Sequence, residues 1–203
     1  MYDRGRLTER LIKLGIELDE QQTEQFMDYY RILAEWNQVM NLTAITDYNE
    51  VVDKHFVDSL SLARVCDLTE NIRVLDLGTG AGFPGIPLKI VYPGLDIVLI
   101  DSLNKRIKFL DTVIRTLGLK NITAVHGRAE DYGRDRNYRE SFDLCVSRAV
   151  ANLSTLAEYC IPFVKKGGRF ISYKSGNVES EAVESKKAVN ILGGRIGAVE
   201  SFL

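Results

Sequence analysis

Cysteine is scarce in this 203-residue sequence, and the three that it has are far apart. Cys66, Cys145 and Cys160 lack the even number and the close spacing of a disulfide framework or a zinc site, so we expect buried, reduced thiols and no bound metal. No apolar run approaches the ~20 residues of a membrane-spanning helix, and the amino terminus lacks the apolar core of a signal peptide. The sequence therefore predicts a cytoplasmic protein without a membrane partner.

A bulk charge of one sign is also missing, because the formal net charge is only −2 at pH 7. The charges are nevertheless unevenly distributed: acidic side chains outnumber basic ones in residues 1–60, and basic ones outnumber acidic ones in residues 102–148. Most such stretches are simply solvated faces, but a local basic excess is compatible with a phosphate-bearing substrate. The length fits one domain with an appendage, which we expect to be a monomer.

The sequence from Ile72 onward alternates short apolar strands with helical segments. We expect strands at 72–77, 96–100, 122–125, 142–147 and 168–173, and helices at 84–91, 103–117, 152–161 and 177–190. This alternation is typical of an α/β fold with a doubly wound, mostly parallel sheet and right-handed connections. We also expect Gly167–Gly168 to end the helix before the fifth strand, and Arg195–Leu203 to form a sixth strand.

The residues before the first strand have helical periodicity. Apolar positions predict helices from Leu7 to Leu14, from Asp19 to Met40 and from Asn49 to Leu62, with polar residues 41–46 breaking the second from the third. The aromatic stripe on the second helix is more typical of a core than of a base-stacking platform. We therefore divide the chain into a helical extension, residues 1–70, and a domain, residues 71–203.

The stretch that follows the first strand contains the pattern Asp76-x-Gly78-x-Gly80-x-Gly82-x-x-Gly85. Glycines allow positive φ angles and let a ligand approach the backbone, and the helix after them points N–H groups toward that ligand. The Gly80-x-Gly82-x-x-Gly85 part alone also fits a nicotinamide cofactor, or merely a structural turn. Asp76 argues against a pyrophosphate and for a cationic group. The motif resembles that of S-adenosylmethionine-dependent methyltransferases with a Rossmann-like fold.

Two further strand ends carry candidate cofactor contacts. Asp101 ends the second strand 25 residues after Asp76, the separation expected of a carboxylate that binds ribose hydroxyls. That spacing supports a nucleoside ligand without choosing between S-adenosylmethionine and NAD. Ala129 and Glu130 follow the third strand, where an adenine ring would lie against a carboxylate and backbone groups.

The fourth strand end limits the reaction. Ser147-Arg148-Ala149 is not the Asn/Asp-Pro-Pro-aromatic sequence of enzymes that methylate exocyclic amines, and Cys145 lies within a strand rather than at a nucleophile's position. A substrate with its own lone pair, such as a ring nitrogen, needs neither a base nor a covalent intermediate, so alignment would supply most of the rate. Arg148 could hold a phosphate or a base edge with its fork of donors.

Four motifs occur in the order known from one bacterial family. They are Asn41-Leu42-Thr43-Ala44-Ile45-Thr46, His55-Phe56-Val57-Asp58-Ser59-Leu60, the glycine motif from Asp76 to Gly85, and Ser147-Arg148-Ala149. Together they resemble the 16S ribosomal RNA small-subunit methyltransferase G family, also called glucose-inhibited division protein B, over about residues 10 to 195. The resemblance implies methylation of guanine N7 in 16S rRNA of the small subunit or its precursor, with S-adenosylmethionine as cofactor.

The resemblance also implies roles for individual residues. It implies cofactor contacts at Gly78, Phe83, Ala129, Glu130 and Arg148. Arg148, with Asn41, His55 and Lys174, is then expected to face the guanine or its phosphates. One departure is that members of the family usually continue past a final strand pair into a basic tail, whereas this sequence stops at Ser201-Phe202-Leu203. Either the sequence is truncated or this member lacks the last hairpin, and the charge with which such a tail neutralises RNA phosphates is then missing from it.

Two other functions compete with methyl transfer. A binding module of the same fold would dock on ribosomal RNA without turnover. An NAD-dependent oxidoreductase is disfavoured by Asp76 and by the absence of a proton-relay constellation in the sequence.

Overall fold

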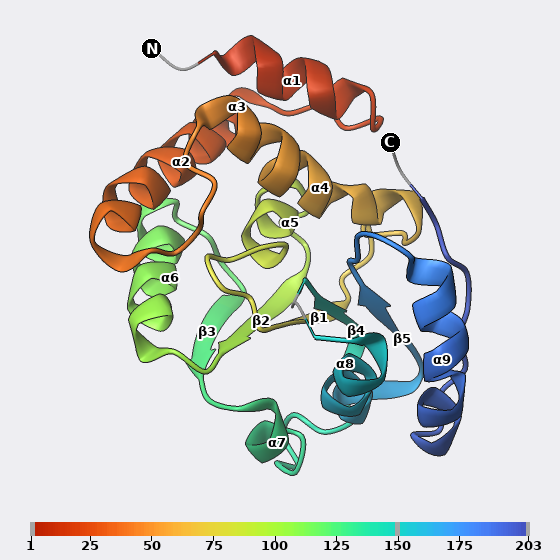
Figure 1. Ribbon diagram of the computed structural model, residues 1–203. Helices are drawn as coiled ribbons and strands as arrows, with labels where there is room; N and C mark the ends of the chain where they lie inside the picture. The colour runs from red at the N-terminus through yellow and green to blue at the C-terminus, as the bar shows by residue number, and fades with distance from the viewer. Residues whose placement is uncertain (1–2, 149–150, 202–203) are drawn as a thin grey trace.

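The computed structural model describes residues 3–148 and 151–201, and in these ranges it contains one parallel sheet of five strands in the order β3-β2-β1-β4-β5 (Figure 1). The strands are β1 (Arg73–Leu77), β2 (Asp96–Asp101), β3 (Ile122–His126), β4 (Phe142–Ser147) and β5 (Val164–Ser172). All four neighbouring pairs are parallel, as the alternating pattern predicts. The expected doubly wound α/β fold is confirmed.

The two faces of the sheet bury different side chains of the same strands. In β1, Val74 belongs to one apolar cluster, whereas Leu75 and Leu77 belong to the other. Helices α5 (Gly85–Val91) and α6 (Asn104–Thr116) cover the first face, and α8 (Leu153–Cys160) covers the second, with α9 (Val178–Ile191) packed against α8. Because both faces are covered, the strands are apolar along most of their length.

The helical extension forms a second layer outside α5 and α6. It contains α1 (Arg4–Ile12) and α2 (Glu20–Met40), and α2 contacts both α5 and α6 (Figure 1). Asp19 caps α2, because its side chain accepts from the Gln22 N–H while the Gln22 side chain accepts from the Asp19 N–H. The predicted core stripe is Phe26, Tyr30, Leu33 and Trp36. The first three are buried in this layer, and Trp36 is partly buried against the same apolar cluster.

The third predicted helix is present but is not uniform. It runs through α3 (Tyr48–Val51), a π-helical segment η1 (Val52–Val57), α4 (Asp58–Leu60) and the 3₁₀ turn η2 (Ser61–Arg64). Apolar spacing predicts a helix here but cannot distinguish a π-helical turn from an α-helical one. π-Helical turns are rare and frequently accompany functional sites.

Two sequence expectations are wrong in the carboxyl-terminal part. Gly167 and Gly168 lie inside β5, at an irregularity in its pairing with β4, rather than at a helix end; α8 ends at Cys160 and the 3₁₀ turn η3 (Ile161–Phe163) follows it. Residues 195–201 form no strand, since they are mostly exposed and pair with no strand of the sheet, and residues 202–203 of the expected strand lie outside the described residues. Apolar content alone does not make a strand without a neighbour to bond.

The strand order reverses between β1 and β4. β2 and β3 follow β1 on one side of it, and β4 lies on its other side. In open α/β sheets, ligands bind beyond the carboxyl ends of the strands at such a reversal. The loops after β1 and β4 are therefore where a ligand site is expected.

Candidate cofactor and substrate site

The glycine loop, residues 78–84, connects β1 to α5 and is shaped by a buried carboxylate beneath it. Asp76 is fully buried, and its Oδ2 accepts hydrogen bonds from Thr79 Oγ1 at 2.6 Å and from the Gly85 N–H at 2.8 Å. A Cβ on Gly85 would lie 2.9 Å from that oxygen and 2.3 Å from Leu99 Cδ2. Only glycine fits there, so the motif sets the turn itself.

The two carboxylate oxygens of Asp76 differ in their hydrogen bonds. Oδ1 is buried and accepts no hydrogen bond within residues 3–148 and 151–201. Burial raises the pKa of Asp76 to about 6, and the hydrogen bonds from Thr79 and Gly85 act in the opposite direction. A buried acceptor without a donor costs about 1–3 kcal/mol, so this carboxylate suits a ligand that brings a donor or a positive charge. A Cβ on Gly80 would meet nothing within 4 Å, which leaves that part of the loop open to a ligand.

Asp101 holds the same loop from the neighbouring strand. Its Oδ2 accepts from the Gly80 N–H at 2.9 Å, its Oδ1 accepts from the Leu103 N–H at 2.9 Å, and Arg106 forms an ion pair with it at 3.0 Å. The Asp101 side chain is only 2 % exposed. Because Arg106 donates to both oxygens, ribose hydroxyls could bind Asp101 only if the more exposed Arg106 moved aside.

A cleft of about 360 Å³ opens at the carboxyl ends of the strands, within the range of small-molecule sites. The residues that line it come from β1, β2 and β4, from the loops after β1, β2 and β3, from the short helix α7 (Ala129–Tyr132) and from α8: Leu77, Gly78, Ile100, Asp101, Ser102, Gly127, Arg128, Ala129, Glu130, Ser147, Leu156 and Tyr159. Four of the predicted cofactor residues, Gly78, Asp101, Ala129 and Glu130, thus line one cleft. Ser102 and Arg128 also line it, and sequence reasoning did not single them out.

Leu156 and Tyr159 were also not predicted as site residues, and neither were Leu77, Ile100, Gly127 and Ser147. Leu156 and Tyr159 lie on α8 and close the cleft from the second face of the sheet. Their spacing of three on a helix after the fourth strand is a signal in the sequence, but it is equally typical of a core-facing helix.

Arg148 lies at the end of β4, but its guanidinium contacts the helical extension. It donates to Lys54 O at 3.0 Å and to Ser59 Oγ at 3.1 Å, and it forms an ion pair with Asp58 at 3.2 Å. The side chain is 19 % exposed. Arg148 therefore joins the sheet to the segment η1–α4. Ala149, its neighbour in the motif, lies outside the described residues.

His55 lies between this arginine and the glycine loop. Its ring stacks on Phe83 at a centroid distance of 4.5 Å, and its Nε2 is 3.0 Å from Thr43 Oγ1. Burial, and then the Arg148 guanidinium, lower the pKa of His55 to about 4, so the imidazole is neutral at pH 7. Phe83 is buried in an aromatic cluster with Tyr29 and is not among the residues that line the cleft.

Lys174 and Asn41, the other two residues expected to face the substrate, lie apart from His55 and Arg148. Lys174 Nζ donates to Ala151 O at 2.5 Å and to Glu181 Oε1 at 2.7 Å, so it ties the end of β5 to α9. Asn41 is exposed and ends α2 in the left-handed conformation, φ 48°. The structure therefore brings His55 and Arg148 together, whereas it does not place Lys174 or Asn41 in contact with either.

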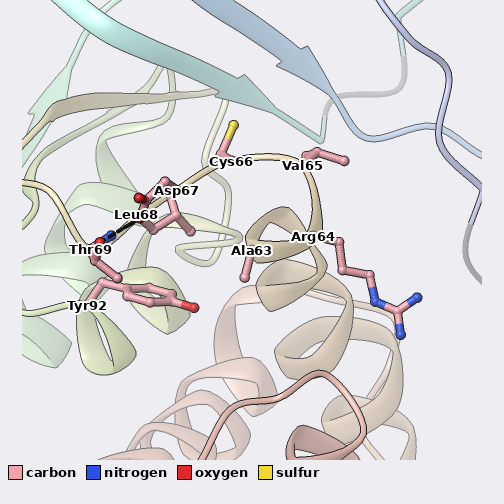
Figure 2. Close-up of a pocket in the computed structure, with 8 residues that line it drawn as sticks. All are labelled: Ala63, Arg64, Val65, Cys66, Asp67, Leu68, Thr69 and Tyr92. Atoms are coloured by element: carbon pink, nitrogen blue, oxygen red, sulfur yellow. Dashed lines mark hydrogen bonds between the residues drawn. The ribbon is translucent and has the colours of Figure 1, made fainter.

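A second hollow has a volume of about 430 Å³ and shares no lining residue with this cleft; Figure 2 shows the side chains that line it. It is lined by Tyr92 and by the segment Ala63–Thr69, which precede β2 and β1. It is thus at the amino ends of the strands, opposite to the end where ligands bind in such sheets. We assign it no role.

Two structural features are absent from the part of the chain that the structure describes. In residues 3–148 and 151–201, no three His, Cys, Asp or Glu side chains gather as metal ligands would. In the same residues, no helix combines the length and the apolar character needed to cross a bilayer.

Comparison with known proteins identifies relatives over the whole length. A family model described as rRNA small subunit methyltransferase G matches residues 22–203. A Ribosomal RNA small subunit methyltransferase G from Lachnoclostridium phytofermentans is 56 % identical over 202 residues, which is 100 % of this chain and 84 % of that protein. The protein of the same name from Acetivibrio thermocellus is 52 % identical over 199 residues, covering 98 % of this chain and 81 % of the relative.

Solved structures support the fold at low sequence identity. A SAM dependent methyltransferase from Aquifex aeolicus aligns with a TM-score of 0.55 at 20 % identity, covering 75 % of this chain and 86 % of that one. A putative sarcosine dimethylglycine methyltransferase from Galdieria sulphuraria aligns with a TM-score of 0.56 at 16 % identity, covering 82 % and 74 %. The fold is thus Rossmann-like.

Proposed function

This chain belongs to the rRNA small subunit methyltransferase G family, and from that premise we propose that it transfers a methyl group from S-adenosylmethionine to guanine N7 of 16S ribosomal RNA in the small ribosomal subunit. The observation that carries the proposal is the identity of 56 % over 202 residues to a relative of that name. The cleft at the strand reversal, with an open glycine loop and a buried unpaired carboxylate oxygen, supports it.

The residues of the cleft suit the parts of this cofactor. Gly78 lines the cleft and would let the methionine part approach the backbone, whereas Gly80 and Asp76 are not among the lining residues. The buried Asp76 Oδ1 would attract the positive charge of the cofactor from beneath the glycine loop. Asp101 would bind the ribose once Arg106 releases it, and Ala129 with Glu130 would read the adenine edge. S-adenosylmethionine supplies an electrophilic methyl group that is bonded to a sulfonium sulfur. When that C–S bond breaks, the sulfur leaves as part of a neutral thioether.

The reaction does not require the protein to remove a proton from the substrate. Guanine N7 attacks with its own lone pair and keeps the methyl group, so no base has to remove a proton. His55 agrees with this, because it is neutral and held between Phe83, Thr43 and Arg148 rather than poised as a base. The protein's task is alignment, which can supply several orders of magnitude in rate.

Several finer statements belong to the same proposal. The substrate is the 16S rRNA in the small subunit or its precursor, the protein acts as a cytoplasmic monomer, and residues 1–70 form a helical extension to the cofactor-binding domain, residues 71–203. Asn41, His55, Arg148 and Lys174 line the approach of the guanine. The ion pairs of Arg148 and Lys174 support a role in shaping this approach more than direct contact with RNA.

The test has two stages, cofactor first and transfer second. Titration calorimetry with S-adenosylmethionine, with NAD as the control, should give micromolar binding of the former only. Radioactive methyl transfer to small subunits that lack the modification should then label 16S rRNA at one guanine. NAD binding would overturn the cofactor, and S-adenosylmethionine binding without label on subunits or their precursors would make the protein a binding module.

A further inference from the structure

A tyrosine of the helical extension reaches the glycine loop. Tyr29, on α2, is fully buried, and its hydroxyl donates a hydrogen bond of 2.5 Å to Ala81 O in the loop. Burial, and then the nearby Asp76, raise the pKa of Tyr29 well above its usual value, so the hydroxyl keeps its proton and remains a donor. This bond joins two segments that are 52 residues apart in the sequence.

The Tyr29 hydroxyl lies directly against the backbone of the glycine loop. A Cβ on Gly82 would lie 2.8 Å from the Tyr29 hydroxyl oxygen, so the loop backbone passes directly against it. The Tyr29 ring lies 5.4 Å from the Phe83 ring and 5.6 Å from the Phe56 ring, between centroids. The ring therefore cannot withdraw without disturbing the aromatic cluster around it.

Three successive loop residues are each tied by a different side chain. Asp76 accepts from Thr79, Asp101 accepts from the Gly80 N–H, and Tyr29 donates to Ala81 O. The first two ties come from the sheet, as the glycine motif predicts. The third comes from the extension, so the conformation of the loop is not determined by the Rossmann-like part alone.

We propose that Tyr29 is a positioning residue for the cofactor: its bond to Ala81 O orients the glycine loop so that Gly78 and Gly80 face the methionine part of S-adenosylmethionine. This inference rests on the proposed function for the identity of the ligand. It makes the helical extension part of the cofactor site. Without the bond, the loop would sample other conformations. Part of the binding free energy would then be used to order the loop, so the affinity for S-adenosylmethionine would fall.

The experiment compares Tyr29→Phe with a matched control, Tyr48→Phe. Both variants keep the ring and lose the hydroxyl; that of Tyr48 donates to Asp3 O at 2.9 Å and to Met27 Sδ at 3.6 Å, and neither acceptor belongs to the glycine loop. For Tyr29→Phe we expect the Kd and the KM for S-adenosylmethionine to rise about tenfold, with kcat at saturating cofactor changed by less than about twofold. For Tyr48→Phe we expect both constants to stay at the wild-type value.

A second measurement reads the loop directly. Hydrogen exchange of the peptide that covers residues 78–88, without cofactor, should be faster in Tyr29→Phe than in wild type and unchanged in Tyr48→Phe. A Tyr29→Phe protein that melts at a lower temperature but binds S-adenosylmethionine and protects this peptide like wild type would overturn the inference and leave the proposed function intact. A wild-type protein that does not bind S-adenosylmethionine would overturn both.

Discussion

Arg148 connects the end of β4 to three residues of one helical segment, Lys54, Asp58 and Ser59. Arg148→Ala would remove these bonds and leave Asp58 without its cation. We expect methyl transfer to small subunits to fall about 100-fold, because the segment that carries His55 would shift relative to the cofactor cleft. Initial rates at saturating S-adenosylmethionine would measure this.

A control is Arg139→Ala, which removes a more exposed arginine that also donates to a backbone carbonyl, Gly133 O at 3.1 Å. It should keep the wild-type rate. The Kd for S-adenosylmethionine should be nearly unchanged in both variants, since Arg148 is not among the residues that line the cleft. Wild-type activity in Arg148→Ala would remove the residue from the site.

His55 and Asp76 should affect stability in opposite directions below neutral pH. The pKa of His55 is lowered from 6.5 to about 4, so the unfolded chain binds this proton first, and stability falls as pH drops from 6.5 to 4. The pKa of Asp76 is raised from 3.8 to about 6, so the folded chain binds this proton first, and stability rises as pH drops from 6 to 4.

Urea unfolding of single variants would separate the two effects. Relative to wild type, His55→Gln should gain stability as pH drops from 6.5 to 4, whereas Asp76→Asn should lose it between 6 and 4, each by at most about 1.4 kcal/mol per pH unit. Parallel profiles for wild type and His55→Gln would mean that His55 titrates normally in the folded protein.

At the scale of elements, β4 and α8 meet through a pair of thiols. Cys145 on β4 and Cys160 on α8 are fully buried, and burial raises the pKa of Cys145 well above its usual value. Cys145→Ser would place a hydroxyl in this interface, and we expect it to cost about 1–3 kcal/mol in the free energy of unfolding without changing the Kd for S-adenosylmethionine. Denaturant unfolding and calorimetry would check the two parts.

Cys66→Ser serves as the comparison, because Cys66 is only partly buried. Its cost should be smaller than that of Cys145→Ser. If Cys145→Ser abolished methyl transfer while remaining folded and binding the cofactor, Cys145 would be a reacting group after all.

The elements around the sheet were largely predictable, because each rests on a local pattern. The apolar runs of β1 to β4 and the glycine after α6 are such patterns, and they place these elements to within a residue or two. The π-helical segment and the early start of β5 were not predictable. Both are in contact with partners distant in the sequence: Arg148 donates to Lys54 O in the first, and β4 pairs with the second.

The residues of the candidate site were likewise predictable where they follow a local pattern and not where they depend on distant partners. Gly78, Asp101, Ala129 and Glu130 were placed by their positions at strand ends, and they line one cleft. The ion-pair partners of Arg148 and Lys174 could not be read from the sequence, because Asp58 lies 90 residues before Arg148 and Glu181 lies a turn into α9. Tyr29 was missed for the same reason, since its helical spacing shows only that it faces inward.

At the scale of the whole molecule, a ligand that binds only the folded protein stabilises it. S-adenosylmethionine at 100 times its Kd should add about 2.7 kcal/mol. For a chain of this length, that corresponds to a rise of roughly 5–10 °C in Tm. A thermal melt with S-adenosylmethionine, and with NAD at the same concentration, would measure the rise.

The NAD sample should melt at the same temperature as the protein alone. A rise with NAD and none with S-adenosylmethionine would mean that the loop from Gly80 to Gly85 accommodates a pyrophosphate and that the unpaired oxygen of Asp76 has another purpose.

The strand order has a consequence for the time course of synthesis. The first 126 residues contain the extension and β1 to β3, which are consecutive neighbours, so they can assemble while the rest of the chain is still being made. β4 then inserts beside β1 and brings Ser147 to the cleft and Arg148 to η1. A nascent chain that ends before Ser147 therefore has most of its hydrophobic core but an incomplete cofactor cleft, which is completed only when β4 and α8 have been made.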